Sequence, residues 1–107
     1  MVILKGMNHD KLLRLLQKKR SFFEAILDLS QEENSLPFTD WISVLEQKKV
    51  LLSCIDDIDT ELTPFKATLH HLSQDVTDEL AKIRSIVKTI LDVDSQNQEW
   101  RRKTLYE

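Results

Sequence analysis

The sequence is poor in the residues that interrupt helices. It contains one Gly and two Pro in 107 residues, and turn formers gather only around Pro37 and around Pro64. Phosphate-binding loops and nucleophile elbows need glycines, and metal sites need clustered ligands, so the motifs for this chemistry are missing. Apolar residues recur at helical spacing over most of the chain, which predicts an all-α fold of three long helices. Such a chain offers amphipathic helical surface, which indicates protein binding and no enzymatic activity.

Cysteine and long apolar runs are equally scarce. Cys54 is the single cysteine, so we expect a small buried hydrophobe in a reducing compartment. No apolar run approaches the ~20 residues of a membrane span, and residues 1–6 lack the features of a signal peptide. We therefore expect a cytoplasmic protein without a membrane span. The net charge of −3 disfavours nucleic acid as a partner, and the length predicts a single helical domain over residues 1–107.

The first helix is predicted over residues 8–33, with Asn8 or Asp10 as its N-cap. The cationic run at 18–20 is interpreted as a solvated face, because three charges are fewer than the ~4–8 of a lipid-binding cluster. Pro37 ends this segment. The connection is about five residues long, so the second helix should return antiparallel to the first and form a helical hairpin. The apolar stripe consists of Leu12, Leu13, Leu16, Phe23, Ile26 and Leu27.

The second helix is predicted over residues 39–62, with Thr39 or Asp40 as its cap. Lys48 falls on the apolar stripe, where we expect its stem to pack while its ammonium reaches water. The acids at 56–59 lack the glycine turn and the terminal glutamate of a calcium loop, so they predict a solvated face and no metal site. The stripe consists of Trp41, Leu45, Leu52, Ile55, Ile58 and Leu62.

The third helix is predicted over residues 74–103, beginning near Ser73 or Asp75. Residues 63–73 are compatible with a kink, a short helical turn or a loop, because Thr63-Pro64 can both end and restart a helix. If the third helix continues past Val93, Asn97 lies close to the helix seam, where a lone Asn can set the register. The polar C-terminal stretch is either a fraying tail or an arm that binds a partner. The stripe consists of Val76, Leu80, Ile83, Val87 and Ile90.

His70-His71 is the only candidate for chemistry. Histidine phosphotransfer domains are also helical bundles, and their reactive histidine begins a His-x-Leu-Lys-Gly motif. Here His70-His71-Leu72-Ser73-Gln74 supplies the His and the Leu but neither the Lys nor the Gly. No further Cys, Asp or His stands at a spacing that would complete a zinc site. We therefore expect solvated histidines, no cofactor and no metal.

The centre of the chain is the run Asp40-Trp41-Ile42-Ser43-Val44-Leu45-Glu46-Gln47-Lys48-Lys49-Val50-Leu51-Leu52, which follows the pattern Asp-x-x-x-x-Leu-x-x-Lys-(Lys/x)-x-Leu-Leu. In this pattern it resembles FlgN-type flagellar export chaperones. The helix before it, with its acidic end and short turn, and the segment 58–65 follow the layout of that family. The resemblance covers about two-thirds of the chain, and the Gly-Asp pair often found at the turn is replaced here by Thr39-Asp40.

The resemblance implies a cytoplasmic chaperone for type III secretion. Such proteins bind hook-associated subunits, typically through the C-terminal region of the subunit, and deliver them to the export gate. Recognition would place an amphipathic helix of the client on an incomplete helical layer. We expect the client to contact the third helix through Ile83, Val87, Ile90 and Trp100, although a core role for Ile83 and Val87 remains open.

The alternative is a structural or regulatory coiled-coil adaptor that self-associates or binds components of the secretion machinery. A homodimer is compatible with both functions, because Trp41, Trp100 or the stripe of the third helix can pair two copies.

Overall fold

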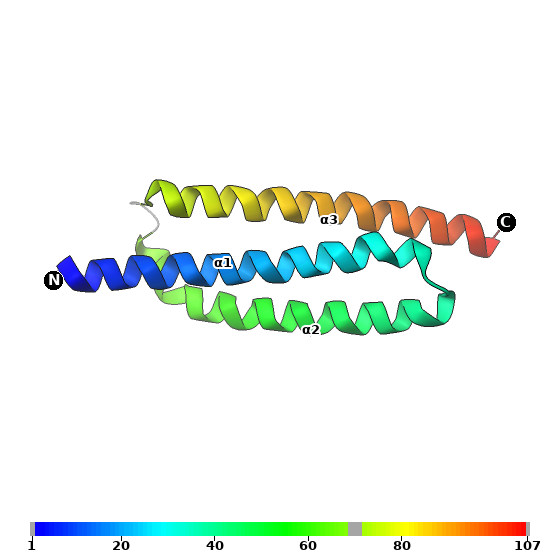
Figure 1. The fold of residues 1–107 in the computed structure, drawn as a ribbon, viewed down its shortest axis with the longest axis horizontal. Coiled ribbons are helices and arrows are strands. Elements are labelled where there is room, and N and C mark those ends of the chain that lie inside the picture. Colours follow the sequence, from blue (N-terminus) through cyan, green and yellow to red (C-terminus); the bar gives the residue numbers. More distant parts are fainter. Residues whose placement is uncertain (1, 69–71, 107) are drawn as a thin grey trace.

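The computed structural model describes residues 2–68 and 72–106 and consists of three long helices that run up, down and up (Figure 1). They are α1 (Val2–Glu32), α2 (Phe38–Leu62) and α3 (Gln74–Tyr106). Short 3-10 helices follow the first two, namely η1 (Glu33–Ser35) and η2 (Thr63–Thr68). No strand occurs in the described ranges, which confirms the predicted all-α fold. The molecule is a rod of 64 × 21 × 18 Å.

Helix α1 begins earlier than predicted. It starts at Val2, so Asn8 and Asp10 lie inside the helix and neither caps it. A single internal glycine such as Gly6 costs a helix only about 1 kcal/mol, which does not end it without a proline or a competing cap. The end of α1 is close to the prediction, because the chain tightens into η1 at Glu33.

The α1–α2 connection follows from Pro37. Leu36 takes the extended conformation, with ψ of 149°, as expected for the residue before a proline. Helix α2 begins directly after Pro37, and no side chain caps it. The prediction that Thr39 or Asp40 caps this helix is therefore wrong. Asp40 lies in the first turn, where its charge complements the helix dipole.

The second connection begins with η2, so the chain continues as a short 3-10 helix after Leu62. Pro64 lacks the N–H that an α-helix would need there, and 3-10 turns are common at such ends. Residues 69–71, which include His70 and His71, lie outside the described residues. Helix α3 begins at Gln74. The Ser73 Oγ accepts a hydrogen bond of 3.3 Å from the Val76 N–H, so Ser73 is the N-cap of α3.

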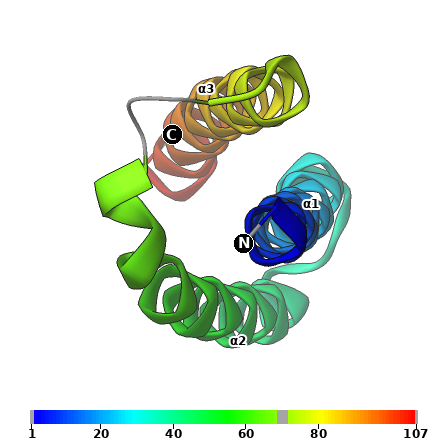
Figure 2. The same ribbon diagram turned by 90° about the vertical axis from the view of Figure 1, so that its left-hand side faces the viewer.

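Helix α1 is the centre of the bundle. Both α2 and α3 pack along α1, while the backbones of α2 and α3 stay apart from each other (Figure 2). The apolar core has two buried clusters. The first contains Leu12, Leu16, Val76 and Ile83, and the second contains Ile26, Ile55 and Ile90. Within the described ranges, no helix has a stretch long and apolar enough to span a membrane.

Candidate functional site

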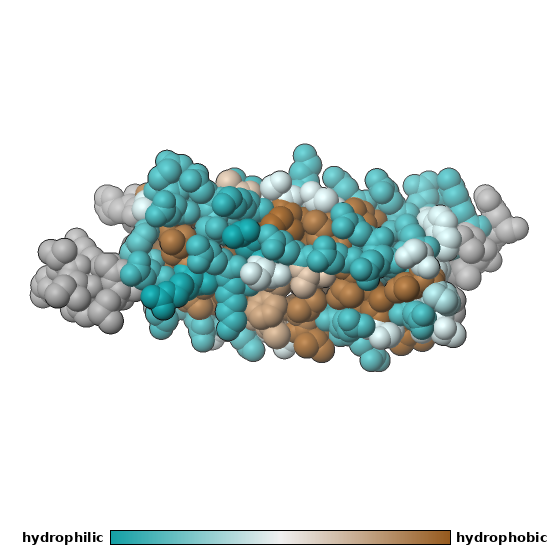
Figure 3. Space-filling model, in the orientation of Figure 1, coloured by the Kyte–Doolittle hydropathy of each residue, from teal (hydrophilic) through white to brown (hydrophobic). Residues whose placement is uncertain are grey.

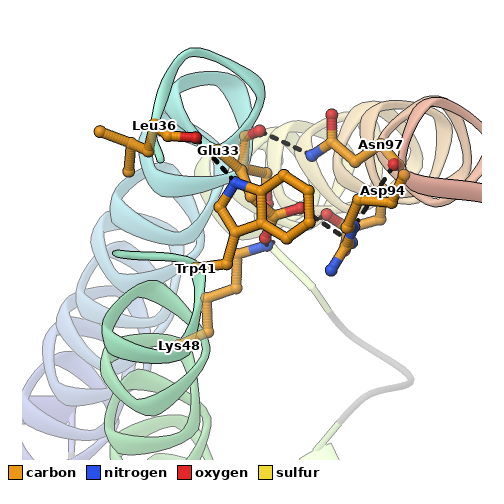
Figure 4. A network of polar contacts seen from close by, with 8 residues as sticks. Glu33, Leu36, Trp41, Lys48, Asp94 and Asn97 are labelled. Carbon is orange, nitrogen blue, oxygen red and sulfur yellow. Dashed lines mark hydrogen bonds and ion pairs between the residues drawn. The ribbon is translucent and has the colours of Figure 1, made fainter. Parts of the chain in front are cut away.

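A buried carboxylate organises the end of the bundle where α1 meets the first turn of α2. Glu33 in η1 is 1% exposed. Its Oε1 lies 3.2 Å from the Lys48 ammonium on α2, and its Oε2 lies 2.9 Å from the Arg101 guanidinium on α3. The Arg101 contact is an ion pair by distance, but its angle does not make a hydrogen bond, and Oε2 accepts none. Glu33 thus connects all three helices (Figure 4).

Lys48 links the same network to α3. It is 9% exposed, and its ammonium also lies 3.2 Å from the Asp94 carboxylate. The prediction that this ammonium reaches water is therefore wrong. The physical reason is that two carboxylates, from η1 and from α3, replace water as its partners, as a buried charge requires. Sequence periodicity carries no signal for partners this distant in the chain.

Two tryptophans close this end of the rod. The Trp41 indole N–H donates to the Leu36 carbonyl at 3.0 Å, which ties α2 to the preceding connection. The Trp41 and Trp100 rings meet edge to face, with centroids 5.6 Å apart and planes at 68°, a favoured geometry for aromatic pairs. The Arg101 guanidinium lies 5.3 Å from the centre of the Trp41 ring. Trp100 thus packs on the bundle and remains 40% exposed.

Asn97 lies at the contact between α1 and α3, as predicted for a third helix that continues past Val93. Its side-chain amide donates to the Ser30 carbonyl at 2.8 Å, and both residues are fully buried. The Ser30 hydroxyl has no hydrogen-bond partner. A buried polar pair of this kind fixes the register of two helices, because a shift by one turn would leave the amide unpaired.

Part of the basic run of α1 is used for packing. Lys19 lies 2.6 Å from Asp59 on α2, and Arg20 lies 2.8 Å from the buried Glu79 on α3. The interpretation of residues 18–20 as a solvated face is therefore wrong for two of the three. The hydrogen bond to Glu79 raises the pKa of Arg20 against a smaller desolvation effect. A raised pKa favours the charged guanidinium in the fold, so the stability that it contributes is lost as the pH rises through the pKa of Arg20.

The four residues predicted to contact a partner differ in how far they are buried. Ile83 and Ile90 are buried in the two core clusters, so in this conformation both serve the core. Val87 is half-buried against the first cluster. Trp100 is the most accessible of the four and belongs to the tryptophan pair.

Three exposed leucines flank the side between α2 and α3, while Ile42 and Val50 are exposed elsewhere on α2. Leu45 and Leu52 are 42% and 49% exposed. Each lies one turn after a residue that contacts α3, namely Trp41 and Lys48. Leu91 is 63% exposed. It stands one turn before Asp94, which contacts Lys48, and one turn after Val87.

Residues three and four apart share a helix face, so these leucines flank the side between α2 and α3, whose backbones stay apart (Figure 2). We call Leu45, Leu52 and Leu91 the α2–α3 seam. Figure 3 shows a different face, which is mostly hydrophilic, with hydrophobic side chains visible between the helices.

Other kinds of site find no support in the part of the chain that the structure describes. No group of three or more His, Cys, Asp or Glu is arranged there to hold a metal ion. Cys54 is a free, half-buried thiol. The phosphotransfer alternative depends on His70 and His71, which lie outside the described residues.

Comparison with the models of known protein families, with curated proteins and with solved structures gave no match to this chain.

Proposed function

We propose that the chain is a protein-binding helical module, in which the α2–α3 seam takes up an amphipathic helix of a partner protein. One observation carries this proposal. The backbones of α2 and α3 both follow α1 and stay apart from each other, although side chains such as Trp41 and Trp100 meet across the gap, and exposed leucines flank the side between them. A fourth helix laid along that side would bury these leucines and complete a four-helix bundle. Helix-on-helix recognition through an apolar face is a recurring mode of peptide binding.

The size of the seam favours a reversible complex. Full burial of a leucine is worth roughly 1.5–3 kcal/mol, and the seam leucines begin about half exposed. The partner contributes a similar area, while association costs roughly 4–15 kcal/mol. These terms leave at most about 5 kcal/mol of net binding free energy, so a single helix of this kind binds with a dissociation constant no tighter than roughly 0.1 mM. Such an affinity suits a protein that holds a client and then releases it.

The resemblance to FlgN-type chaperones supplies the class of client. We propose that the chain acts in the cytoplasm and holds an amphipathic segment of a hook-associated or other type III export substrate. In this proposal α2 and α3 share the contact, and Val87 and Trp100 border it. Ile83 and Ile90 support the site from the core.

The test is affinity capture of the tagged full-length chain from the cells that express it, with partners identified by mass spectrometry. Leu52→Asp combined with Leu91→Asp places two charges in the seam. Val50→Asp is the matched control, because Val50 is 63% exposed and stands two residues from Leu52, on the opposite side of α2. We expect export substrates with the parent chain and with the Val50 variant, and their loss with the seam variant.

The adaptor function remains the second candidate, and the rod of 64 × 21 × 18 Å favours it as a spacer. An adaptor would be recovered alone or with components of the secretion machinery. Its capture would not depend on Leu52 and Leu91.

A further inference from the structure

The outer side of α2 carries an apolar pattern that the core does not use. Ile42, Leu45, Lys49 and Leu52 follow one another at steps of three, four and three residues, so they form one stripe along the helix. The three apolar members are 58%, 42% and 49% exposed, and Lys49 is exposed as well. We call these four residues the α2 stripe. Alternating steps of three and four are the spacing with which one helix packs on another in a coiled coil.

Charges of both signs accompany the α2 stripe. Glu46 and Lys49 are exposed and one turn apart, and neither takes part in the ion pairs among the described residues. Asp56 continues the stripe one turn after Leu52 and is exposed. The other exposed charged residues of α2, which lie off the stripe or after its last member, are Asp40, Asp57, Asp59 and Glu61.

We infer that a second copy of the chain covers the α2 stripe, with its own α2 running in the opposite direction. When the two copies are related by a two-fold axis at the level of Gln47, Ile42 of one copy lies opposite Leu52 of the other, and Leu45 lies opposite Lys49. This register matches all four stripe positions and removes all three apolar side chains from water. The stripe is therefore complementary to itself, as a two-fold interface requires.

The charges favour the antiparallel direction. At this register Lys49 of each copy lies about 1.5 Å along the axis from the level of Glu46 of the other, so two ion pairs form around the two-fold axis. Asp56 lies opposite the first turn of α2 in the other copy, where no side chain caps the helix and a negative charge is favoured. In a parallel pair Lys49 would face Lys49 and Asp56 would face Asp56, which opposes pairing.

The length of the overlap predicts a weak dimer. Stable interfaces bury about 1,200–2,000 Å², whereas the stripe extends over only about three turns of one helix. We therefore expect a dissociation constant on the order of 0.1–1 mM. The dimer itself does not depend on the proposed function. Leu45 and Leu52 belong to both the α2 stripe and the α2–α3 seam, however, so under the proposed function a bound client and a second copy exclude each other.

Sedimentation equilibrium of the purified full-length chain tests the pairing, at chain concentrations from about 10 μM to about 1 mM. We expect the average mass to rise from that of one chain toward that of two. Ile42→Asp should keep the chain monomeric, because it places a carboxylate opposite Leu52. Val50→Asp is the matched control, because Val50 is 63% exposed and lies on another side of α2. Both positions are more than half exposed, so both variants should keep the parent's circular dichroism at 222 nm.

Reversal of the charges tests the direction without altering the apolar residues. Lys49→Glu or Glu46→Lys places like charges opposite each other, and each should weaken the antiparallel dimer by at least about tenfold. An equimolar mixture of these two variants should regain the parent's affinity, because every Glu then meets a Lys of the other copy. In a parallel dimer, Lys49→Glu would exchange one like-charged contact for another and leave the affinity nearly unchanged.

Several results would overturn this inference. They are a chain that stays monomeric at about 1 mM, a dimer that Leu91→Asp abolishes and Ile42→Asp does not, a dimer that Lys49→Glu does not weaken, and a mixture of the charge variants that stays monomeric. None of these results bears on client capture. Ile42 lies outside the α2–α3 seam, so Ile42→Asp should leave client capture unchanged. Capture that does not depend on Leu52 and Leu91 would overturn the proposed function and leave the dimer in place.

Discussion

Glu33→Gln is the sharpest test of what holds the three helices together. The substitution keeps the size of the side chain and removes the carboxylate that lies between the Lys48 ammonium and the Arg101 guanidinium. Both cations keep other contacts after the change. Lys48 retains Asp94 at 3.2 Å, and Arg101 retains the face of Trp41 at 5.3 Å.

The expected cost follows from this geometry. Breaking a buried ion pair by removing one partner costs about 3–5 kcal/mol, because a charge stays buried without compensation. The remaining contacts offset part of that cost, and the Arg101 side chain is 23% exposed, which screens its charge. We therefore expect a loss of about 2–3 kcal/mol in the free energy of unfolding. For a chain of this size the midpoint of thermal unfolding should fall by roughly 10–20 °C.

The assay is urea unfolding followed by circular dichroism at 222 nm, with the slope of the transition compared between variants. Glu46→Gln is the matched control, since Glu46 is exposed on α2 and takes part in none of the ion pairs among the described residues. Its effect should stay within about 0.5 kcal/mol. If Glu33→Gln costs no more than this control, the buried network does not hold the helices together and the reasoning fails.

Three further predictions concern packing, and the same unfolding assay checks each of them. Ser30→Ala should stabilise the chain by about 0.5–1.5 kcal/mol, because it removes a buried hydroxyl without a hydrogen-bond partner and favours the helix; a loss of stability would mean that this hydroxyl has a partner. Trp41→Ala should cost about 3–5 kcal/mol and Trp100→Ala less than half as much, because only Trp41 is buried; equal costs would contradict this order. Leu52→Asp should change stability by less than about 1 kcal/mol, because Leu52 is about half exposed and serves no core cluster; a larger loss would place it in the core.

The helices were predictable because their signals are local. Apolar spacing and the two prolines fix the number of helices, and Ser73 is an N-cap that can be recognised from sequence. Asn97 was placed correctly, since a helix extended past Val93 brings it to the seam. The start of α1 was missed because nothing near Gly6 or Asn8 forces a boundary there.

The polar network was not predictable. Glu33 follows the last apolar residues of the α1 stripe, so its position in the sequence predicts an exposed side chain at the end of a helix. It is buried because Lys48 and Arg101, 15 and 68 residues further along the chain, converge on it in the folded state. Such pairing depends on helix register, which periodicity does not contain.

The binding residues show a further limit of periodicity. Ile83 and Ile90 have the spacing of a binding stripe and of a core stripe alike, and the structure uses both in the core. Leu45 and Leu52 were part of the predicted stripe of the second helix, yet both remain exposed. The difference arises because the backbones of α2 and α3 each follow α1 and stay apart from each other. Their facing sides therefore stay open even where they are apolar.

Site-specific photo-cross-linking in the cells that express the chain tests the central claim most directly. A photoreactive amino acid replaces Leu52, Leu91 or Val50 in separate full-length variants, and adducts are identified by mass spectrometry. The account predicts adducts with one partner protein from positions 52 and 91 and none from position 50. Adducts from position 50 alone, or equal adducts from all three positions, would contradict a binding site in the α2–α3 seam.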